Sequence, residues 1–181
     1  MKHLKWGILA VLFLFVILLF SLVGNTSTAD SQQAGSDDSQ QSGRCKQIRA
    51  IIVDSSAPAG CTSPFNFCAA GTVEGNHGLN GTTYFVLDGA VAGPSTAPGF
   101  SATSGILTYT TPHGTLTVRE TGVSKLVGRP SNGFLTAVQE IISGTGRFEG
   151  ATGLLYLDGK DVNSVFTSHI TGELCLPGPH E

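Results

Sequence analysis

From residue 46 onward, the chain is a succession of strand-like segments. Each is rich in β-branched, aromatic or alternating apolar residues, and Gly, Pro, Asn or Ser separates it from the next. The segments are 46–54, 67–75, 82–91, 102–111, 115–121, 133–142, 154–160 and 164–175. No stretch among them has the 3.6-residue apolar period of an amphipathic helix. The sequence therefore predicts an all-β domain.

Short connections between most of these segments predict that neighbours in the chain pair antiparallel. Pro112-His113-Gly114 is a tight turn that joins two segments as a hairpin. Longer connections include 92–100, which contains Pro94 and Pro98, and the polar stretch 122–132. Closing the sheet removes exposed edges, and eight strands enclose an interior that side chains can fill. We expect an eight-stranded antiparallel up-and-down β-barrel over residues 45–176, with a two-sheet sandwich as the alternative.

A glycine-rich stretch, 141–153, separates the sixth and seventh segments. It holds Gly144, Gly146, Gly150 and Gly153, with Phe148 in the middle. The spacing is not G-x-G-x-x-G, no Gly-Lys-Ser/Thr follows, and no helical period follows either, so a phosphate-binding loop is not indicated. We expect a connector whose glycines provide positive φ angles and close backbone approach.

The N-terminus indicates export. Lys2, His3 and Lys5 precede the uncharged stretch 6–23, which as a helix would reach roughly 27 Å, close to the hydrocarbon thickness of a bilayer. The small residues Ser27-Thr28-Ala29 form a cleavage site. Residues 1–29 are therefore either a cleaved signal peptide or a retained membrane anchor. Both interpretations place the barrel outside the cytoplasm, secreted or anchored, with membrane contact only through this helix if it is retained.

Two polar segments flank the predicted barrel. Residues 30–44 are rich in Ser, Gln, Asp and Gly and contain no large apolar residue, so they predict a flexible linker. Residues 177–181 form a short C-terminal tail.

Four cysteines follow the export segment, where disulfides persist, and they permit three pairings. Cys61 and Cys68 bracket a short loop, whereas Cys45 and Cys175 meet if the first and last strands pair. Zinc is the competing interpretation, but Cys-x6-Cys lacks the usual tight ligand spacing and no paired histidines accompany it. The sequence favours the disulfides Cys45–Cys175 and Cys61–Cys68, and no metal.

Two glutamates are candidate catalytic residues because they lie on apolar stripes. Glu120 shares a strand face with Leu116 and Val118. Glu140 shares a face with Phe134, Val138 and Ile142. Burial on such a stripe would raise the pKa of a carboxyl and suit it to acid–base work, and the two carboxylates could flank a ligand. The alternative is structural, with each glutamate solvated or paired with Arg119 or Arg147.

Candidate ligand-binding residues are Arg119, Tyr84, Tyr109 and Tyr156. Net charge of −3 and scattered basic residues exclude a nucleic-acid partner. A Gly-x-Ser-x-Gly elbow, a His-Glu-x-x-His pair and cofactor motifs are all absent from the sequence, so we expect no cofactor.

The glycine-rich stretch also carries a family resemblance. Its sequence at 144–153, Gly-Thr-Gly-Arg-Phe-Glu-Gly-Ala-Thr-Gly, resembles the connector of the allene oxide cyclase and dirigent barrels. Cys-Thr-Ser-Pro at 61–64, Leu-Asn-Gly-Thr-Thr at 79–83 and Ile-Thr-Gly-Glu-Leu-Cys at 170–175 are similar to exported proteins with an allene-oxide-cyclase-like barrel. The resemblance implies an eight-stranded antiparallel barrel and, as in the plant families, a homotrimer. It also implies either cyclisation of an unstable fatty-acid epoxide or steering of radical coupling.

Two functions follow from these observations. The first is an exported barrel that binds a small apolar or amphipathic ligand, or a partner protein. The second is an isomerase or cyclase that acts on a reactive apolar intermediate. A ligand-sized cavity with Glu120 or Glu140 pointing in would favour the enzyme, and a barrel plugged by apolar side chains would favour an interaction role.

Overall fold

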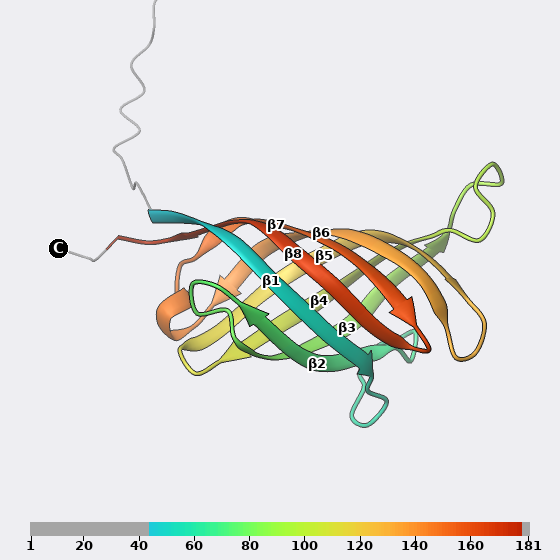
Figure 1. The fold of residues 1–181 in the computed structure, drawn as a ribbon, viewed down its shortest axis with the longest axis horizontal. Helices are drawn as coiled ribbons and strands as arrows, with labels where there is room; N and C mark the ends of the chain where they lie inside the picture. The colour runs from blue at the N-terminus through green and yellow to red at the C-terminus, as the bar shows by residue number, and fades with distance from the viewer. Residues whose placement is uncertain (1–43, 179–181) are drawn as a thin grey trace, which may run out of the picture. The chain divides into compact units, whose positions relative to one another are not determined.

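The computed structural model describes residues 44–178, which form a closed antiparallel barrel (Figure 1). The strands are β1 (Arg44–Ser56), β2 (Cys68–Gly75), β3 (Gly81–Ala92), β4 (Ser101–Thr111), β5 (Gly114–Val127), β6 (Asn132–Gly144), β7 (Thr152–Val162) and β8 (Val165–Leu176). Each strand pairs with its neighbour in the chain, and β8 pairs with β1 to close the sheet. The predicted eight-stranded up-and-down barrel is confirmed.

Alternating side chains fill one half of the barrel interior. Buried residues recur at every second position, as on β8, where Phe166, Ser168 and Ile170 point inward. The half where β1 begins and β8 ends is solid, because Tyr109, Leu79, Leu116 and Leu174 pack there with at most 1% of their surface exposed. Burial of apolar surface on this scale is the main stabilising contribution to the fold.

The glycine-rich connector closes this solid end. A 3₁₀ turn, η1 (Gly146–Phe148), inserts Phe148 so that its side chain is fully buried in the core. Gly146 and Gly150 have φ angles of 59° and 68°, a region that glycine adopts without cost. A Cβ atom on Gly144 would lie 2.1 Å from the carbonyl oxygen of Phe148. The expectation of a connector that uses positive φ angles and close backbone approach is confirmed.

Both expected disulfides form. Cys45 of β1 and Cys175 of β8 are direct partners across the seam where the barrel closes. Cys61 and Cys68 close the short loop before β2. The first bridge therefore covalently joins the two strands that complete the barrel.

One connection was predicted wrongly. Most of the polar stretch 122–132 is not a loop, because β5 continues to Val127 and β6 begins at Asn132, which leaves only 128–131 as a turn. Val123 pairs with Thr136 of β6 and Ser124 pairs with both Ser101 of β4 and Leu135 of β6. Backbone pairing on both sides holds Val123 and Ser124 extended, in a segment whose side chains are largely exposed to water.

The expected N-terminal helix, its cleavage site and the polar linker up to residue 43 lie outside the described residues. Within residues 44–178, no helix is long and apolar enough to cross a membrane.

Candidate functional site

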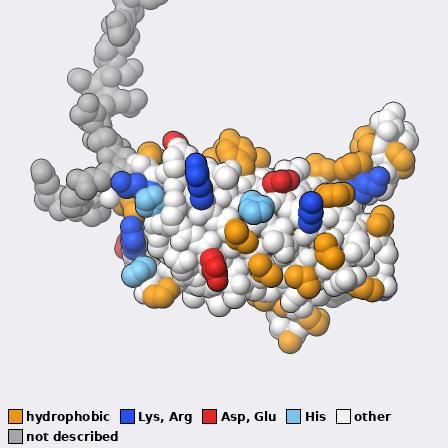
Figure 2. All heavy atoms as spheres, viewed as in Figure 1, with side chains coloured by type: hydrophobic (Ala, Val, Ile, Leu, Met, Phe, Trp, Pro, Cys, Tyr) orange, Lys and Arg blue, Asp and Glu red, His pale blue; other side chains and the backbone are white. Residues whose placement is uncertain are grey.

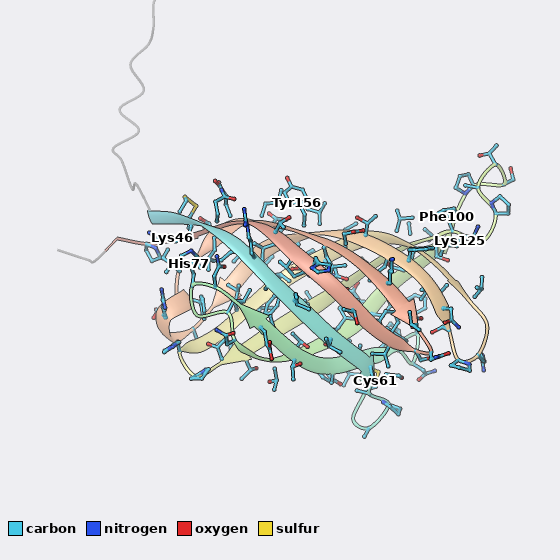
Figure 3. All side chains as sticks on the ribbon, in the orientation of Figure 1. Lys46, Cys61, His77, Phe100, Lys125 and Tyr156 are labelled. Atoms are coloured by element: carbon cyan, nitrogen blue, oxygen red, sulfur yellow. A yellow bond between two sulfur atoms is a disulfide. The ribbon has the colours of Figure 1, made fainter. Side chains whose placement is uncertain are left out.

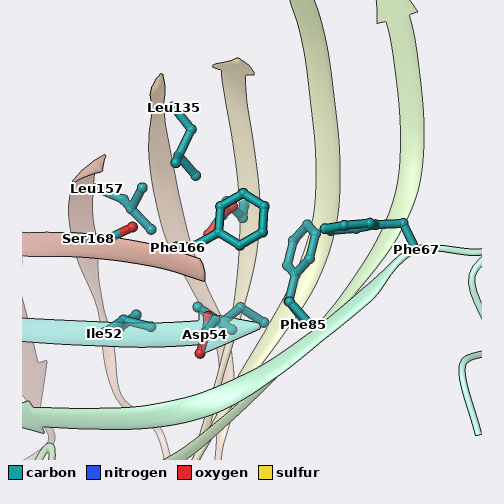
Figure 4. A pocket seen from close by; sticks show the side chains of 11 residues that line it. Ile52, Asp54, Phe67, Phe85, Leu135, Leu157, Phe166 and Ser168 are labelled. Atoms are coloured by element: carbon teal, nitrogen blue, oxygen red, sulfur yellow. The ribbon is translucent and has the colours of Figure 1, made fainter. Parts of the chain in front are cut away.

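The barrel half where β1 ends and β8 begins is hollow. It contains an inner cavity of about 60 Å³ and an outer cavity of about 220 Å³. The two cavities adjoin, because they share the lining residues Phe67, Phe85, Glu120, Leu135 and Phe166. Figure 4 shows the side chains that line the inner cavity. The outer cavity reaches residues near the ends of strands, Leu126 on β5 and Leu135 on β6, and we call it the mouth of the site.

The walls of both cavities are mainly apolar. Ile52, Leu107 and Leu157 line the inner cavity, and Leu87 and Leu126 line the outer one. The only ionisable side chains among the lining residues are Asp54 and Glu120. A few polar groups in an apolar concavity are typical of small-molecule sites.

Glu120 is held in place by a chain of two buried hydrogen bonds. Nε2 of Gln139 donates to Oε2 of Glu120 at 2.7 Å, and the hydroxyl of Tyr109 donates to Oε1 of Gln139 at 2.6 Å. Gln139 and Tyr109 are both completely buried. The amide therefore orients the carboxyl, and the tyrosine fixes which way the amide faces.

Asp54 approaches the inner cavity from β1. The hydroxyl of Thr83 on β3 donates to Oδ1 of Asp54 at 2.5 Å. Thr83 is itself buried. Two carboxyl groups from different sides of the barrel thus line one small cavity.

Burial raises the pKa of both carboxyl groups. Removal from water raises the pKa of Glu120 to about 7, with the hydrogen bond from Gln139 lowering it and the charge of Asp54 raising it further. Burial likewise raises the pKa of Asp54 to about 6, partly offset by the hydrogen bond from Thr83. Each group therefore exchanges a proton near neutral pH, where ordinary carboxyls are fully ionised.

Three phenylalanines stand where the two cavities meet. The ring of Phe67 contacts those of Phe85 and Phe166 edge-to-face, with centroid distances of 6.4 and 6.1 Å (Figure 4). Phe67 directly precedes Cys68, so the Cys61–Cys68 disulfide restrains the loop that positions it. In the same loop, the hydroxyl of Ser63 donates to the carbonyl oxygen of Leu87 at 2.5 Å.

The structure separates the two candidate catalytic glutamates. Glu120 lines both cavities, on the face that its stripe with Leu116 and Val118 predicts. Glu140 is exposed on the outer surface of β6, together with Phe134, Val138 and Ile142. The two carboxylates therefore do not flank a common cavity as expected.

The candidate binding residues are also divided between the two faces. Tyr109 is inside the barrel, where it serves the Glu120 network. Tyr84 lies on the face of β3 opposite Phe85, and Tyr156 is 52% exposed on the outside of the barrel (Figure 3). Arg119, also on the outside, forms an ion pair with Asp88 rather than with a glutamate.

Sequence reasoning missed Asp54, Gln139 and the three phenylalanines. The sequence did contain a signal for Asp54. It follows Ile48, Ala50 and Ile52 at every second position, so it shares their face of the strand. Phe67 and Phe166 lie about 100 positions apart, so their contact depends on closure of the barrel between β1 and β8.

Among residues 44–178, no group of three or more His, Cys, Asp or Glu side chains is arranged to hold a metal ion. Comparison with protein-family models, with curated proteins and with solved structures gave no match to this chain.

Proposed function

We propose that this protein is an exported β-barrel that binds a small apolar or amphipathic molecule in its hollow half. The observation that carries the proposal is the pair of adjoining apolar cavities that meet at Glu120. An apolar cavity of roughly 150 Å³ is enough to hold benzene. The outer cavity alone exceeds that volume, and the inner cavity extends it toward the two carboxyls.

Other features support this proposal. An interior cavity favours a small molecule over a partner protein, which would need an outer surface instead. The two disulfides and the apolar stretch 6–23 support an oxidising compartment outside the cytoplasm.

Binding can be tested with a neutral apolar fluorophore whose emission rises when it leaves water. Ala137 is buried and lines the outer cavity, so Ala137→Leu should fill part of the space that the fluorophore occupies. We expect saturable binding to the wild type and at least tenfold weaker binding to Ala137→Leu. The matched control is Ala102→Leu, at an exposed position of β4, and it should bind as the wild type does.

Thermal melting of both variants establishes that each is folded. Equal affinity of Ala137→Leu and the wild type would contradict the proposed site, as would no binding by the wild type.

A second candidate function is proton-transfer catalysis, such as isomerisation or cyclisation of a reactive apolar substrate. Glu120 favours it, because a carboxyl with a pKa of about 7 in an apolar cavity can both remove and return a proton near neutral pH. The resemblance to the allene oxide cyclases supports the same reaction class.

The reactivity of the Glu120 carboxylate can be tested with 5-nitrobenzisoxazole. A base removes its C–H proton, the N–O bond opens, and a coloured nitrophenolate forms. We expect the rate to rise as pH increases through about 7, because the base must be ionised. Glu120→Gln should abolish this activity, and Glu74→Gln, at an exposed position of β2, should retain it. Equal rates for Glu120→Gln and the wild type would contradict a role for this carboxylate.

A further inference from the structure

The two ionisable side chains that line the cavities are both acidic. Asp54 and Glu120 line the inner cavity, and Glu120 also lines the outer one. In contrast, none of the Lys, Arg and His side chains that the structure describes is buried, and Figure 2 shows several of them on the outer surface. The cavity therefore offers a ligand negative charge with no internal cation to neutralise it.

The surroundings of Glu120 reinforce this asymmetry. The adjacent strands place Gly105 and Tyr109 on β4 and Gln139 on β6, and the charge that acts on Glu120 from across the barrel is that of Asp54 on β1. None of these groups is positive. An anionic ligand placed here would be repelled by both carboxylates.

Each carboxyl also has an unused acceptor. Oε2 of Glu120 and Oδ1 of Asp54 accept hydrogen bonds from Gln139 and Thr83. Within residues 44–178, nothing donates to Oε1 of Glu120 or to Oδ2 of Asp54. Both residues line the inner cavity, and an ammonium group has three donors and no acceptor, which is enough to satisfy both oxygens.

Three phenylalanines also suit a ligand that is both cationic and apolar. Phe67, Phe85 and Phe166 line both cavities, and the faces of aromatic rings attract cations, more strongly when water is excluded. Their edges and the leucines around them would contact an apolar body. The same space therefore suits an organic cation with a hydrocarbon tail or ring.

We propose that the hollow half selects small apolar molecules that carry a protonated amine, with the ammonium group between Asp54 and Glu120. This inference rests on the proposed small-molecule site and specifies its ligand class. The ammonium donates to Oε1 of Glu120 and Oδ2 of Asp54, and the apolar part of the ligand occupies the outer cavity beyond the phenylalanines.

Binding of such a ligand depends on pH. At pH 5 both carboxyls are mainly protonated and attract the ammonium weakly, because their pKa values are about 6 and 7. At pH 8 both are ionised while an alkylamine remains charged. Amine affinity therefore rises between pH 5 and pH 8, and near pH 6.5 binding releases protons from the two carboxyls to the buffer.

Isothermal titration of the full-length chain with n-octylamine, n-octanol and n-octanoate tests the inference, because the three share one hydrocarbon tail. At pH 8 we expect the amine to bind at least tenfold more tightly than the alcohol, and octanoate to bind most weakly. At pH 5 the ratio of amine to alcohol affinity should fall toward one. Glu120→Gln and Asp54→Asn should each lower this ratio at pH 8, and Glu74→Gln should leave it unchanged.

The outcomes distinguish the two proposals. If none of the three compounds binds, the small-molecule site itself is refuted. If all three bind equally, or octanoate binds most tightly, the site stands but the selection of amines is overturned. A pH-independent ratio in the wild type overturns it too, and this measurement does not require the variants to fold.

Discussion

Replacing Glu120 by glutamine should make the barrel more stable at alkaline pH. Glutamine keeps an oxygen that can accept the hydrogen bond from Gln139 but cannot ionise. Raising the pKa from 4.5 to about 7 corresponds to about 3 kcal/mol, at about 1.4 kcal/mol per pH unit. Because the folded pKa is the higher one, the folded state binds more protons between pH 4.5 and pH 7. The stability that Glu120 contributes is therefore complete below pH 4.5 and is lost as pH rises through 7.

Urea unfolding followed by circular dichroism, with the disulfides intact, measures this effect at pH 4.5, 6 and 8. We expect wild type and Glu120→Gln to have similar free energies of unfolding at pH 4.5. At pH 8 the variant should be more stable by about 3 kcal/mol. The control Glu74→Gln, at an exposed position, should follow the wild type throughout because its carboxyl stays in water.

Taking the difference between variant and wild type removes the contributions of all other titrating groups. If the difference in free energy of unfolding did not change with pH, burial would not raise the pKa of Glu120. A wild type that gains stability over the variant as pH rises would show that the site stabilises the charged carboxylate, which reverses the argument.

Three further predictions concern the framework. Replacing Cys45 and Cys175 together by serine should lower the free energy of unfolding by about 5 kcal/mol. Replacing Cys61 and Cys68 together should lower it by about 2.5 kcal/mol, because their bridge closes a far smaller loop. Equal losses measured by urea unfolding would contradict this prediction. Tyr109→Phe should cost about 1–3 kcal/mol by leaving Oε1 of Gln139 buried without its donor, and an unchanged melting temperature would refute the importance of that bond. Gly144→Ala should cost about 1–3 kcal/mol, because its Cβ would meet the carbonyl oxygen of Phe148, whereas Gly178→Ala, with open space around it, should melt as the wild type does.

The alternation of side chains predicted the barrel and the inward position of Glu120, but it could not say which face of each strand is inside. On β6 both faces carry large apolar residues, Leu135 and Ile141 inside and Phe134, Val138 and Ile142 outside. Apolar character therefore does not distinguish the two stripes, and Glu140 lies on the outer one. Period two defines which residues share a face, and only the pairing of neighbouring strands decides the direction of that face.

Local sequence patterns also could not predict the cavity. The hydrogen bond between Thr83 of β3 and Asp54 of β1 crosses the barrel interior past β2. The contact between Phe67 and Phe166 joins the loop before β2 to β8, which closure of the sheet brings together. The disulfides were more accessible, because Cys45 and Cys175 mark the two strands that must meet if a barrel of eight consecutive strands is to close.

The solid end of the barrel has a kinetic consequence. Phe148 and the leucines around it fill the interior where β1 begins and β8 ends. A molecule in the inner cavity therefore leaves through the mouth, past Phe67, Phe85 and Phe166. Entry and exit then share one route, and the occupant must leave before its replacement can arrive. Exchange would be limited by the departure rate of the resident molecule, and the product of any reaction inside would compete directly with incoming substrate.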